Sequence, residues 1–455
     1  PPTNPTRHDT TRPARCPGAR GADTTREMDG MKRMGDALGQ SSADRDAEIV
    51  DGGAIIGDVL REQRVEYLFT INGGHIWPIL SRLRENDVRM IHMRHEQSCA
   101  YAADAYARTT GRPGVLAVTA GCGLTNAITG LAVAGLTGSA VVCIAGQHPT
   151  TEDHRGSFQE AYGSDICRTF SKFTKRVLDW STIGVDLRLA FREATSPPPG
   201  PTLVEIPTNI LYETDSRRRQ QPGARVYDPS ELRSGADPAA VARAVDALLR
   251  AERPLVVAGD GVFWSGAAPA LQTFCRTLGI PVYTRRAAQG ALSEDDPLAV
   301  RGAWKKPFTG RADVILAVGF KFWSGEHFGQ PPTWNGDATY IQIDPSPTRI
   351  GWHVSADIPL VGDPLLVLQQ LTDAATHPTA APPPMRAAWR ADVVLVRQQF
   401  DDAMRAQERD VHATTPIHPA RLTREVCELM DRDATVVIDS FTLSGWFSQW
   451  LGATF

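Results

Sequence analysis

The chain has 455 residues, a length that corresponds to roughly three domains of about 150 residues each. Hydrophobic residues make up 42% of it, charged residues 22%, and the net charge is −4. This is the composition of a globular protein, and the charge gives no case for nucleic acid or a membrane as the main partner. The seven cysteines are scattered without a Cys-x-x-Cys pair, which disfavours a disulfide framework or a zinc site and favours a reducing, cytoplasmic location.

Residues 1–45 contain no aromatic side chain and few large apolar ones, so we expect a disordered leader. Its Arg, Thr and Pro content is weakly similar to that of a transit peptide, but it has no amphipathic period. Residues 113–151 contain no Asp, Glu, Lys or Arg, a length that would suffice for a membrane helix. Their order of strand, glycine turn, small-residue helix and strand instead predicts a buried βαβ unit.

Helix and strand patterns alternate through residues 46–212, which predicts an α/β domain with a parallel sheet. The expected helices cover 52–63, 75–86, 96–109, 126–136 and 185–195. The expected strands cover 66–71, 89–93, 115–118, 140–146 and 202–207. A polar stretch rich in Pro and Gly, 213–237, is predicted to be a linker.

A second alternation predicts another α/β domain over 238–372. Its helices are expected at 239–251 and 268–279, and its strands at 254–259, 280–284, 312–319 and 339–344. An Ala/Pro-rich linker and a helix at 385–407 fill most of 373–414. A helix at 417–430 and a strand at 434–440 then predict a third α/β domain, of which 415–455 are an incomplete start. The predicted fold class is therefore α/β, with successive doubly wound parallel sheets.

Three segments carry candidate chemistry. Glu96 stands where a strand ends and a helix begins, at the edge where open α/β sheets bind ligands. The glycine-rich turn Thr119–Asn126 joins a strand to a helix and lets the backbone approach a ligand. A polar loop that contains Gln147 and Gln159 follows the next strand, and such loops often carry function. Each pattern alone is equally typical of ordinary packing or surface residues.

In this order, a helix-entry Glu, Gly-x-Gly-x-Thr-Asn, Gly-Gln and Phe-Gln-Glu closely resemble the pyrimidine-binding domain of thiamine diphosphate enzymes of the acetolactate synthase and 2-hydroxyacyl-CoA lyase type. The resemblance runs from about residue 48 to the end of the chain. It implies that Glu96 hydrogen-bonds the aminopyrimidine of the cofactor and thereby promotes loss of the thiazolium C2 proton. The middle domain would then be Rossmann-like, and the third would bind the diphosphate.

The resemblance assigns roles to further residues. Glu96 and Gln159 are the expected catalytic residues. The expected cofactor-binding positions are Gly73, Gly74, His75, Glu96, Gly121, Cys122, Gly123 and Asn126, with Cys122 in place of the proline of the family. The expected substrate-side positions are Gln147, Phe158 and Lys172.

No metal ligand is expected in this chain. Gly259-Asp260-Gly261 is similar to the magnesium motif of the family, in which an Asn follows some two dozen or more residues later. Because no Asn occurs before Asn335, we interpret the triplet as a Rossmann-like strand-to-helix turn. We expect the true Mg²⁺-diphosphate motif to lie downstream of Phe455, and this chain alone to bind the cofactor weakly or not at all.

In different branches of the family the middle domain holds FAD, ADP, CoA or nothing. The segments 285–308 and 319–334 are more similar to the acyl-CoA branch, so FAD is not favoured. Lys305 and Lys306 are candidates for a nucleotide phosphate, and equally for a solvated pair.

The resemblance predicts a thiamine diphosphate- and Mg²⁺-dependent enzyme, acetolactate synthase-like, that forms or cleaves a C–C bond in 2-keto acids or 2-hydroxyacyl compounds. The alternatives are a 2-hydroxyacyl-CoA lyase or acyl-CoA decarboxylase, and a non-catalytic nucleotide-binding or regulatory remnant. A Rossmann dehydrogenase is disfavoured because no Gly-x-Gly-x-x-Gly with a following acid occurs. The expected partners are a small 2-keto acid or acyl-CoA substrate and further copies of the chain, as a homodimer or homotetramer with active sites between subunits.

Overall fold

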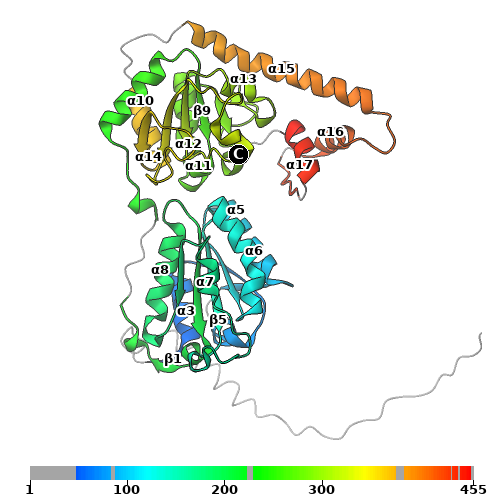
Figure 1. The fold of residues 1–455 in the computed structure, drawn as a ribbon. Coiled ribbons are helices and arrows are strands. Elements are labelled where there is room, and N and C mark those ends of the chain that lie inside the picture. The colour runs from blue at the N-terminus through cyan, green and yellow to red at the C-terminus, as the bar shows by residue number, and fades with distance from the viewer. Residues whose placement is uncertain are drawn as a thin grey trace, which may run out of the picture.

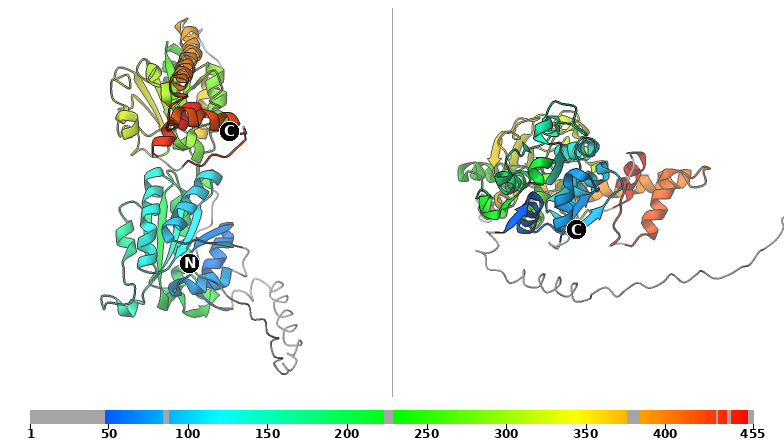
Figure 2. Two further views of the ribbon diagram at one scale, coloured as in Figure 1. Left: turned by 90° about the vertical axis from the view of Figure 1, so that its right-hand side faces the viewer. Right: turned by 90° about the horizontal axis from the view of Figure 1, so that it is seen from below.

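The structure is a computed structural model that describes residues 48–83, 88–222, 229–375, 384–431, 433–438 and 441–451. The expected leader lies outside these residues. Two six-stranded sheets, both parallel throughout, form two α/β units that lie end to end in Figures 1 and 2. The predicted fold class is therefore confirmed.

The first sheet has the strand order β3-β2-β4-β5-β7-β6. Its strands are β2 (Tyr67–Thr70), β3 (Arg89–His92), β4 (Gly114–Val118), β5 (Val141–Gln147), β6 (Phe173–Arg176) and β7 (Pro201–Pro207). Every residue of the three central strands β4, β5 and β7 is buried. They form near-continuous apolar runs because helices cover both faces of the sheet.

Helices cover both faces of this sheet. On one face α3 (Gly52–Glu62), α4 (Trp77–Leu83) and α8 (Ile183–Thr195) share a core with the strands. On the other lie α5 (Glu96–Thr110), α6 (Cys122–Thr137) and the short α7 (Gly163–Cys167). The uncharged segment 113–151 forms β4, α6 and β5, as predicted. Within the described residues no helix is both long and apolar enough to cross a membrane.

The second sheet has the strand order β11-β10-β9-β12-β13-β14. Its strands are β9 (Pro254–Ala258), β10 (Val282–Thr284), β11 (Ala299–Val300), β12 (Val314–Val318), β13 (Thr339–Asp344) and β14 (Ile358–Val361). One face packs on α10 (Pro238–Arg250), α12 (Ala268–Leu278) and α14 (Pro364–Ala375). The other buries an aromatic core that includes Trp334, Phe308 and Trp389. The strand order reverses between β9 and β12, which marks the ligand-binding edge of such sheets.

The remaining elements are short or lie beyond the second sheet. The strands β1 (Ile49–Asp51) and β8 (Thr214–Ser216) pair antiparallel, so part of the segment predicted to be a linker is held against the first unit. Short helices are α9 (Thr208–Leu211), α11 (Asp260–Trp264) and α13 (Lys306–Thr309). The short 3₁₀ segments are η2 (Gly74–Ile76), η3 (Thr150–Glu152), η4 (Trp180–Thr182), η5 (Arg217–Arg219), η6 (Pro229–Leu232), η7 (Arg286–Ala288), η8 (Gly302–Trp304) and the kinked η9 (Ser324–Gly329).

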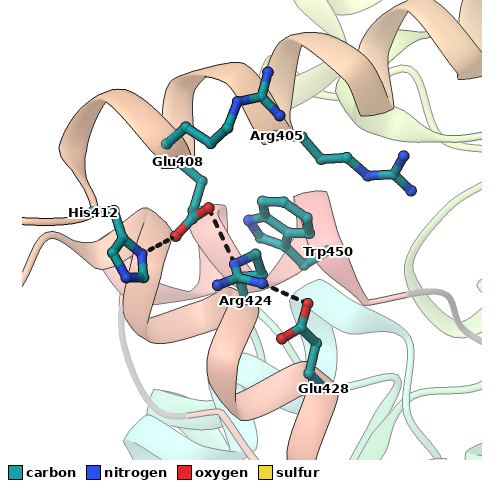
Figure 3. A pocket seen from close by; sticks show the side chains of 7 residues that line it. Arg405, Glu408, His412, Arg424, Glu428 and Trp450 are labelled. Carbon is teal, nitrogen blue, oxygen red and sulfur yellow. Dashed lines mark hydrogen bonds and ion pairs between the residues drawn. The ribbon is translucent and has the colours of Figure 1, made fainter.

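Three helices follow the second sheet: α15 (Met385–Val411), α16 (Pro419–Leu429) and α17 (Phe441–Trp450). Figure 3 shows how α15 and α16 are joined: the Glu408 carboxylate accepts from His412 Nδ1 at 2.7 Å and pairs with Arg424 Nε at 3.2 Å. The strand predicted at 434–440 is not formed over its described residues 434–438. A strand needs a neighbour to accept its backbone hydrogen bonds, and no other described strand lies beside this segment.

The amino edge of the first sheet faces the carboxyl edge of the second. Gly138, just before β5, would place a Cβ 3.6 Å from Nζ of Lys321, which follows β12. A pocket of about 1010 Å³ lies along this boundary and is lined by the ends of α5, α6 and α8 and by the turns after β9, β12 and β13.

The contact between β4 and α5 tests this packing. A Cβ added at Gly114 would lie 2.0 Å from the backbone oxygen of Ala103, and both residues are buried. We therefore expect Gly114→Ala to force β4 and α5 apart and to lower the free energy of unfolding by about 2 kcal/mol. Thermal unfolding followed by circular dichroism measures the effect.

The matched control is Gly74→Ala, because no atom lies within 4 Å of a Cβ added there. Equal melting temperatures for the two variants would contradict the packing described for β4.

Candidate active site

The predicted site residues gather at the carboxyl edge of the first sheet. Glu96 follows β3, the turn Gly73–His75 follows β2, and the glycine-rich turn 119–126 follows β4. These three strands are neighbours in the order β3-β2-β4, and they are parallel. Their carboxyl ends therefore lie side by side, and the three following segments meet.

Glu96 is the first residue of α5 and is half-buried. The helix begins there because the preceding residue, His95, caps it by accepting from the backbone N–H of Gln97 at 3.2 Å. Nδ2 of Asn126, one turn into α6, donates to Glu96 Oε2 at 2.9 Å. Across the described part of the chain, Oε1 receives no hydrogen bond. One carboxylate oxygen is thus held by the protein and the other is left as an acceptor.

Thr119 is the side chain against which the two glycine turns pack. A Cβ at Gly73 would lie 2.4 Å from Thr119 Cβ, and one at Gly123 would lie 2.7 Å from Thr119 Cγ2. Thr119 Oγ1 also lies 3.1 Å from Nδ1 of His75. Burial and, second, the neighbouring His148 lower the pKa of His75, which favours the neutral form of its imidazole. Gly74 has open space around it.

Gln159 closes the same edge from the loop that follows β5. Its Nε2 donates to Cys122 Sγ at 2.9 Å, and a Cβ at Gly121 would lie 2.5 Å from its backbone oxygen. Gly121 has a φ of 56°, which favours glycine. Cys122 occupies the first helical position of α6, a position that also suits the proline of the family. Its thiol contacts Gln159.

Phe158, the residue before Gln159, is 78% exposed. Its ring lies 6.3 Å from the ring of His75, with an interplanar angle of 17°. Both residues therefore face the space in front of the two glycine turns. The structure brings together all of the residues predicted for catalysis and cofactor binding, together with Phe158.

Two predicted substrate-side residues, Gln147 and Lys172, have side chains that bond to other parts of the protein. Gln147 ends β5 but is only 1% exposed, and its side chain is bonded to the backbone oxygen of Ala161 and to Arg176. Lys172 precedes β6, so it lies at the amino edge of the sheet, opposite Glu96. Its Nζ donates to the backbone oxygen of Ser196 at 2.6 Å, and burial lowers its pKa to about 8. Neither position supports the expected contact with a substrate beside Glu96.

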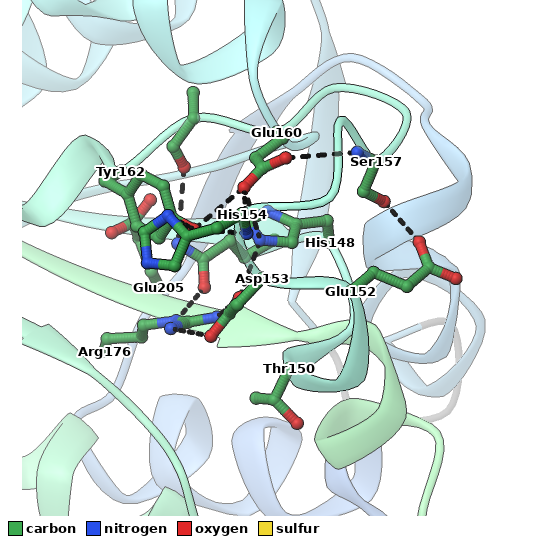
Figure 4. Close-up of polar contacts among 12 residues, drawn as sticks. His148, Thr150, Glu152, Asp153, His154, Ser157, Glu160, Tyr162, Arg176 and Glu205 are labelled. Atoms are coloured by element: carbon green, nitrogen blue, oxygen red, sulfur yellow. Dashed lines mark hydrogen bonds and ion pairs between the residues drawn. The ribbon is translucent and has the colours of Figure 1, made fainter.

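Sequence reasoning missed the polar cluster behind this loop, which Figure 4 shows. Arg176, at the end of β6, donates to both carboxylate oxygens of Asp153, at 2.6 and 2.8 Å. This pairing lowers the pKa of Asp153 to about 2. The buried His148 places Nε2 2.8 Å from the same carboxylate. The tertiary structure brings these residues together, because β5 and the edge strand β6 lie on either side of β7.

The other candidate residues from the sequence lie in the second α/β unit. Gly259-Asp260-Gly261 forms a strand-to-helix turn between β9 and α11, as interpreted, and Asp260 is engaged by Arg286 at 3.1 Å. Lys305 pairs with the fully buried Glu326 and donates to Tyr283, so it is neither free for a phosphate nor solvated. Lys306 is exposed.

Two cations lie at the boundary between the sheets, near the carboxylates of Asp260 and Asp344. Lys321 and Arg349 line the pocket there, and burial lowers the pKa of both, to about 8 for Lys321. Such side chains suit an anionic ligand. Within the described residues no group of three or more His, Cys, Asp or Glu side chains is placed to hold a metal ion.

Comparison with known proteins agrees with this geometry. Residues 50–167 match the family model for the N-terminal TPP binding domain of thiamine pyrophosphate enzymes. Residues 241–371 match the model for the central domain of the same enzymes. Thiamine pyrophosphate is the same compound as thiamine diphosphate.

Three relatives illustrate the range of similarity. The chain is 32% identical over 332 residues to a probable acetolactate synthase large subunit of Methanococcus aeolicus, covering 71% of this chain and 55% of that protein. It is 30% identical over 408 residues to a probable acetolactate synthase of Mycobacterium bovis, covering 87% and 69%. It is 27% identical over 405 residues to 2-hydroxyacyl-CoA lyase 1 of Mus musculus, covering 89% and 68%.

The chain thus spans little more than half the length of the first of these relatives and about two thirds of the other two. Two matched domains in the expected order, and a relative at 30% identity across most of the chain, agree with the arrangement around Glu96. The chain belongs to the thiamine pyrophosphate enzyme family.

Proposed function

We propose that the protein is a thiamine diphosphate-dependent enzyme, acetolactate synthase-like, that forms or cleaves a C–C bond next to the carbonyl of a 2-keto acid or 2-hydroxyacyl compound. The observation that carries the proposal is the Glu96 carboxylate. Asn126 holds one of its oxygens, and the other remains an acceptor beside the two glycine turns. When bound, the cofactor supplies an electron sink for carbon next to a carbonyl.

The residues at the carboxyl edge of the first sheet fit the pyrimidine half of this cofactor. Glu96 Oε1 is the acceptor that would hold a ring nitrogen of the cofactor, and the open space at Gly74 would leave room for a flat ring. His75 and Gln159 line the side toward a substrate. The diphosphate and its Mg²⁺ need an oxygen-rich metal site, which we assign to the diphosphate-binding domain expected in the family.

The substrate class has two candidates. Acetolactate synthases are among the relatives at 30% identity or more, and this favours a 2-keto acid such as pyruvate as the substrate. A 2-hydroxyacyl-CoA lyase is the second candidate, because the mouse relative of that name aligns with 89% of this chain. The pocket beside Lys321 and Arg349 supports an anionic nucleotide or CoA group there, which an acyl-CoA substrate would provide.

The division into domains at 46–212, 238–372 and 415–455 is part of the proposal, as are a homodimer or homotetramer and a cytoplasmic location. The Glu96 edge points away from the boundary with the second sheet, which leaves it open to a second copy. The described cysteines are all unpaired, which supports a reducing compartment.

Replacing Glu96 tests the proposal directly. We expect Glu96→Gln to lower product formation at least about a hundredfold, because a neutral amide cannot hold the proton on the cofactor ring nitrogen as a carboxylate does. The assays are acetolactate formation from pyruvate and cleavage of a 2-hydroxyacyl-CoA to an aldehyde. Both use the product of the whole coding region and, in parallel, the 455-residue chain.

The control is Glu252→Gln, an exposed acid that precedes β9 at the amino edge of the second sheet. Full activity of a folded Glu96→Gln protein would overturn the assignment. Absence of cofactor binding and of both activities in the wild-type product would favour the non-catalytic remnant.

Asn126 provides a graded test of the same site. Asn126→Ala removes the donor to Glu96 Oε2, and the loss of a hydrogen bond to a charged group costs about 1.5–3 kcal/mol. We therefore expect kcat to fall by roughly ten- to a hundredfold, less than for Glu96→Gln. Thr125→Ala on the same helical turn is the control. An Asn126→Ala enzyme with unchanged kcat would show that this hydrogen bond does not support Glu96.

A further inference from the structure

The loop 153–160 folds around the carboxylate of its last residue, Glu160 (Figure 4). Oε1 accepts from the backbone N–H of His154 at 2.6 Å, and Oε2 accepts from those of Gly156 at 2.9 Å and Ser157 at 3.1 Å. The hydroxyl of Tyr162 donates to Oε1 at 2.9 Å. One side chain thus satisfies three backbone donors that no strand or helix satisfies, and Tyr162 chiefly holds the pKa of Glu160 below its usual range.

This loop has backbone geometry that needs support. His154 and Gln159 have φ values of 59° and 61°, in the left-handed region that non-glycine residues seldom adopt. Such conformations persist only where surrounding contacts fix them. The base of the loop is fixed by the bonds of Asp153 to Arg176 and His148. Toward the tip, the backbone N–H groups of His154, Gly156 and Ser157 donate to Glu160, whereas that of Arg155 donates to the backbone oxygen of Glu152.

The two residues that precede Glu160 are those that reach the site. Gln159 donates to Cys122 and covers the turn at Gly121, while Phe158 stacks beside His75. Because they follow directly on the segment whose N–H groups Glu160 binds, a change in the loop moves both side chains. Glu160 itself, by contrast, points back into the cluster of Tyr162 and His148.

We propose that Glu160 is a positioning residue that shapes loop 153–160 and thereby sets Gln159 and Phe158 against the glycine-rich turn and His75. That the loop serves catalysis rests on the proposed function. That Glu160 orders the loop rests only on the contacts described above.

Amide hydrogen exchange of the purified protein tests the ordering role without cofactor or substrate. In Glu160→Gln the carboxylate that binds three N–H groups becomes an amide that presents one oxygen. We expect exchange at His154, Gly156 and Ser157 to be at least about tenfold faster. The matched control is Glu152→Gln in η3, just before the loop, since the Glu152 carboxylate accepts from the Ser157 hydroxyl and from none of these backbone groups.

Unchanged exchange at these amides in Glu160→Gln would overturn the proposal, as would equal acceleration in Glu152→Gln. Exchange in the β4 and β5 amides reports whether the domain is still folded. Should Glu160→Gln unfold it, Glu160→Asp keeps the charge but withdraws the carboxylate by one methylene, and the same amides are compared.

A double-mutant cycle with activity as the readout tests the action through Gln159. We expect Glu160→Gln to lower kcat in the wild-type background and to have little further effect in the Gln159→Ala background. A merely structural role would give equal factors in both backgrounds, which would contradict positioning. If these amides exchange fast in Glu160→Gln but the wild-type protein shows no activity, the ordering role of Glu160 is supported and the proposed function is contradicted.

Discussion

The parallel pairing of β3, β2 and β4 is the constraint on which the candidate site depends. Glu96, Gly73 and Gly123 are separated by up to 50 positions in the chain, yet each follows one of these strands at its carboxyl end. Had any one of the strands run in the opposite direction, its following turn would lie at the far edge of the sheet. Because the central strand β4 is buried on both faces, its direction is fixed by the core and not by the site.

Close contacts between the turns that follow these strands orient the Glu96 carboxylate. Thr119 occupies the space that a side chain at Gly73 or Gly123 would need, so both positions require glycine for packing. That close approach also brings Asn126 within hydrogen-bonding distance of Glu96. The carboxylate is consequently oriented by one neighbour while its other oxygen remains available. A hydrogen-bond acceptor that is already oriented in this way can hold a proton without any rearrangement of the protein during the reaction.

The two sheets contribute in different ways. In this chain the Glu96 edge faces away from the second unit, whereas the boundary between the units collects cations such as Lys321 and Arg349. Lys172 belongs to this boundary, and its pKa is lowered further by Arg349, after the larger effect of burial. The molecule therefore has two separate edges suited to ligands, one with the Glu96 carboxylate and one where Lys321 and Arg349 lie among acidic side chains.

The sequence by itself determined the α/β class, most of the strands and helices, and the position of Glu96 at a helix entry, because these depend on local periodicity and on glycine turns. It also located the turn at Gly121 and Gln159 through the order of motifs. The sequence did not reveal the partners of Lys172, Gln147 and Lys305, since Ser196, Arg176 and Glu326 lie on other elements. Similarly, the apolar run at 434–438 has strand propensity but no described neighbour with which to pair. Whether a charged or polar side chain faces a ligand or is neutralised inside the protein depends on contacts distant in sequence, and only the tertiary structure decided it.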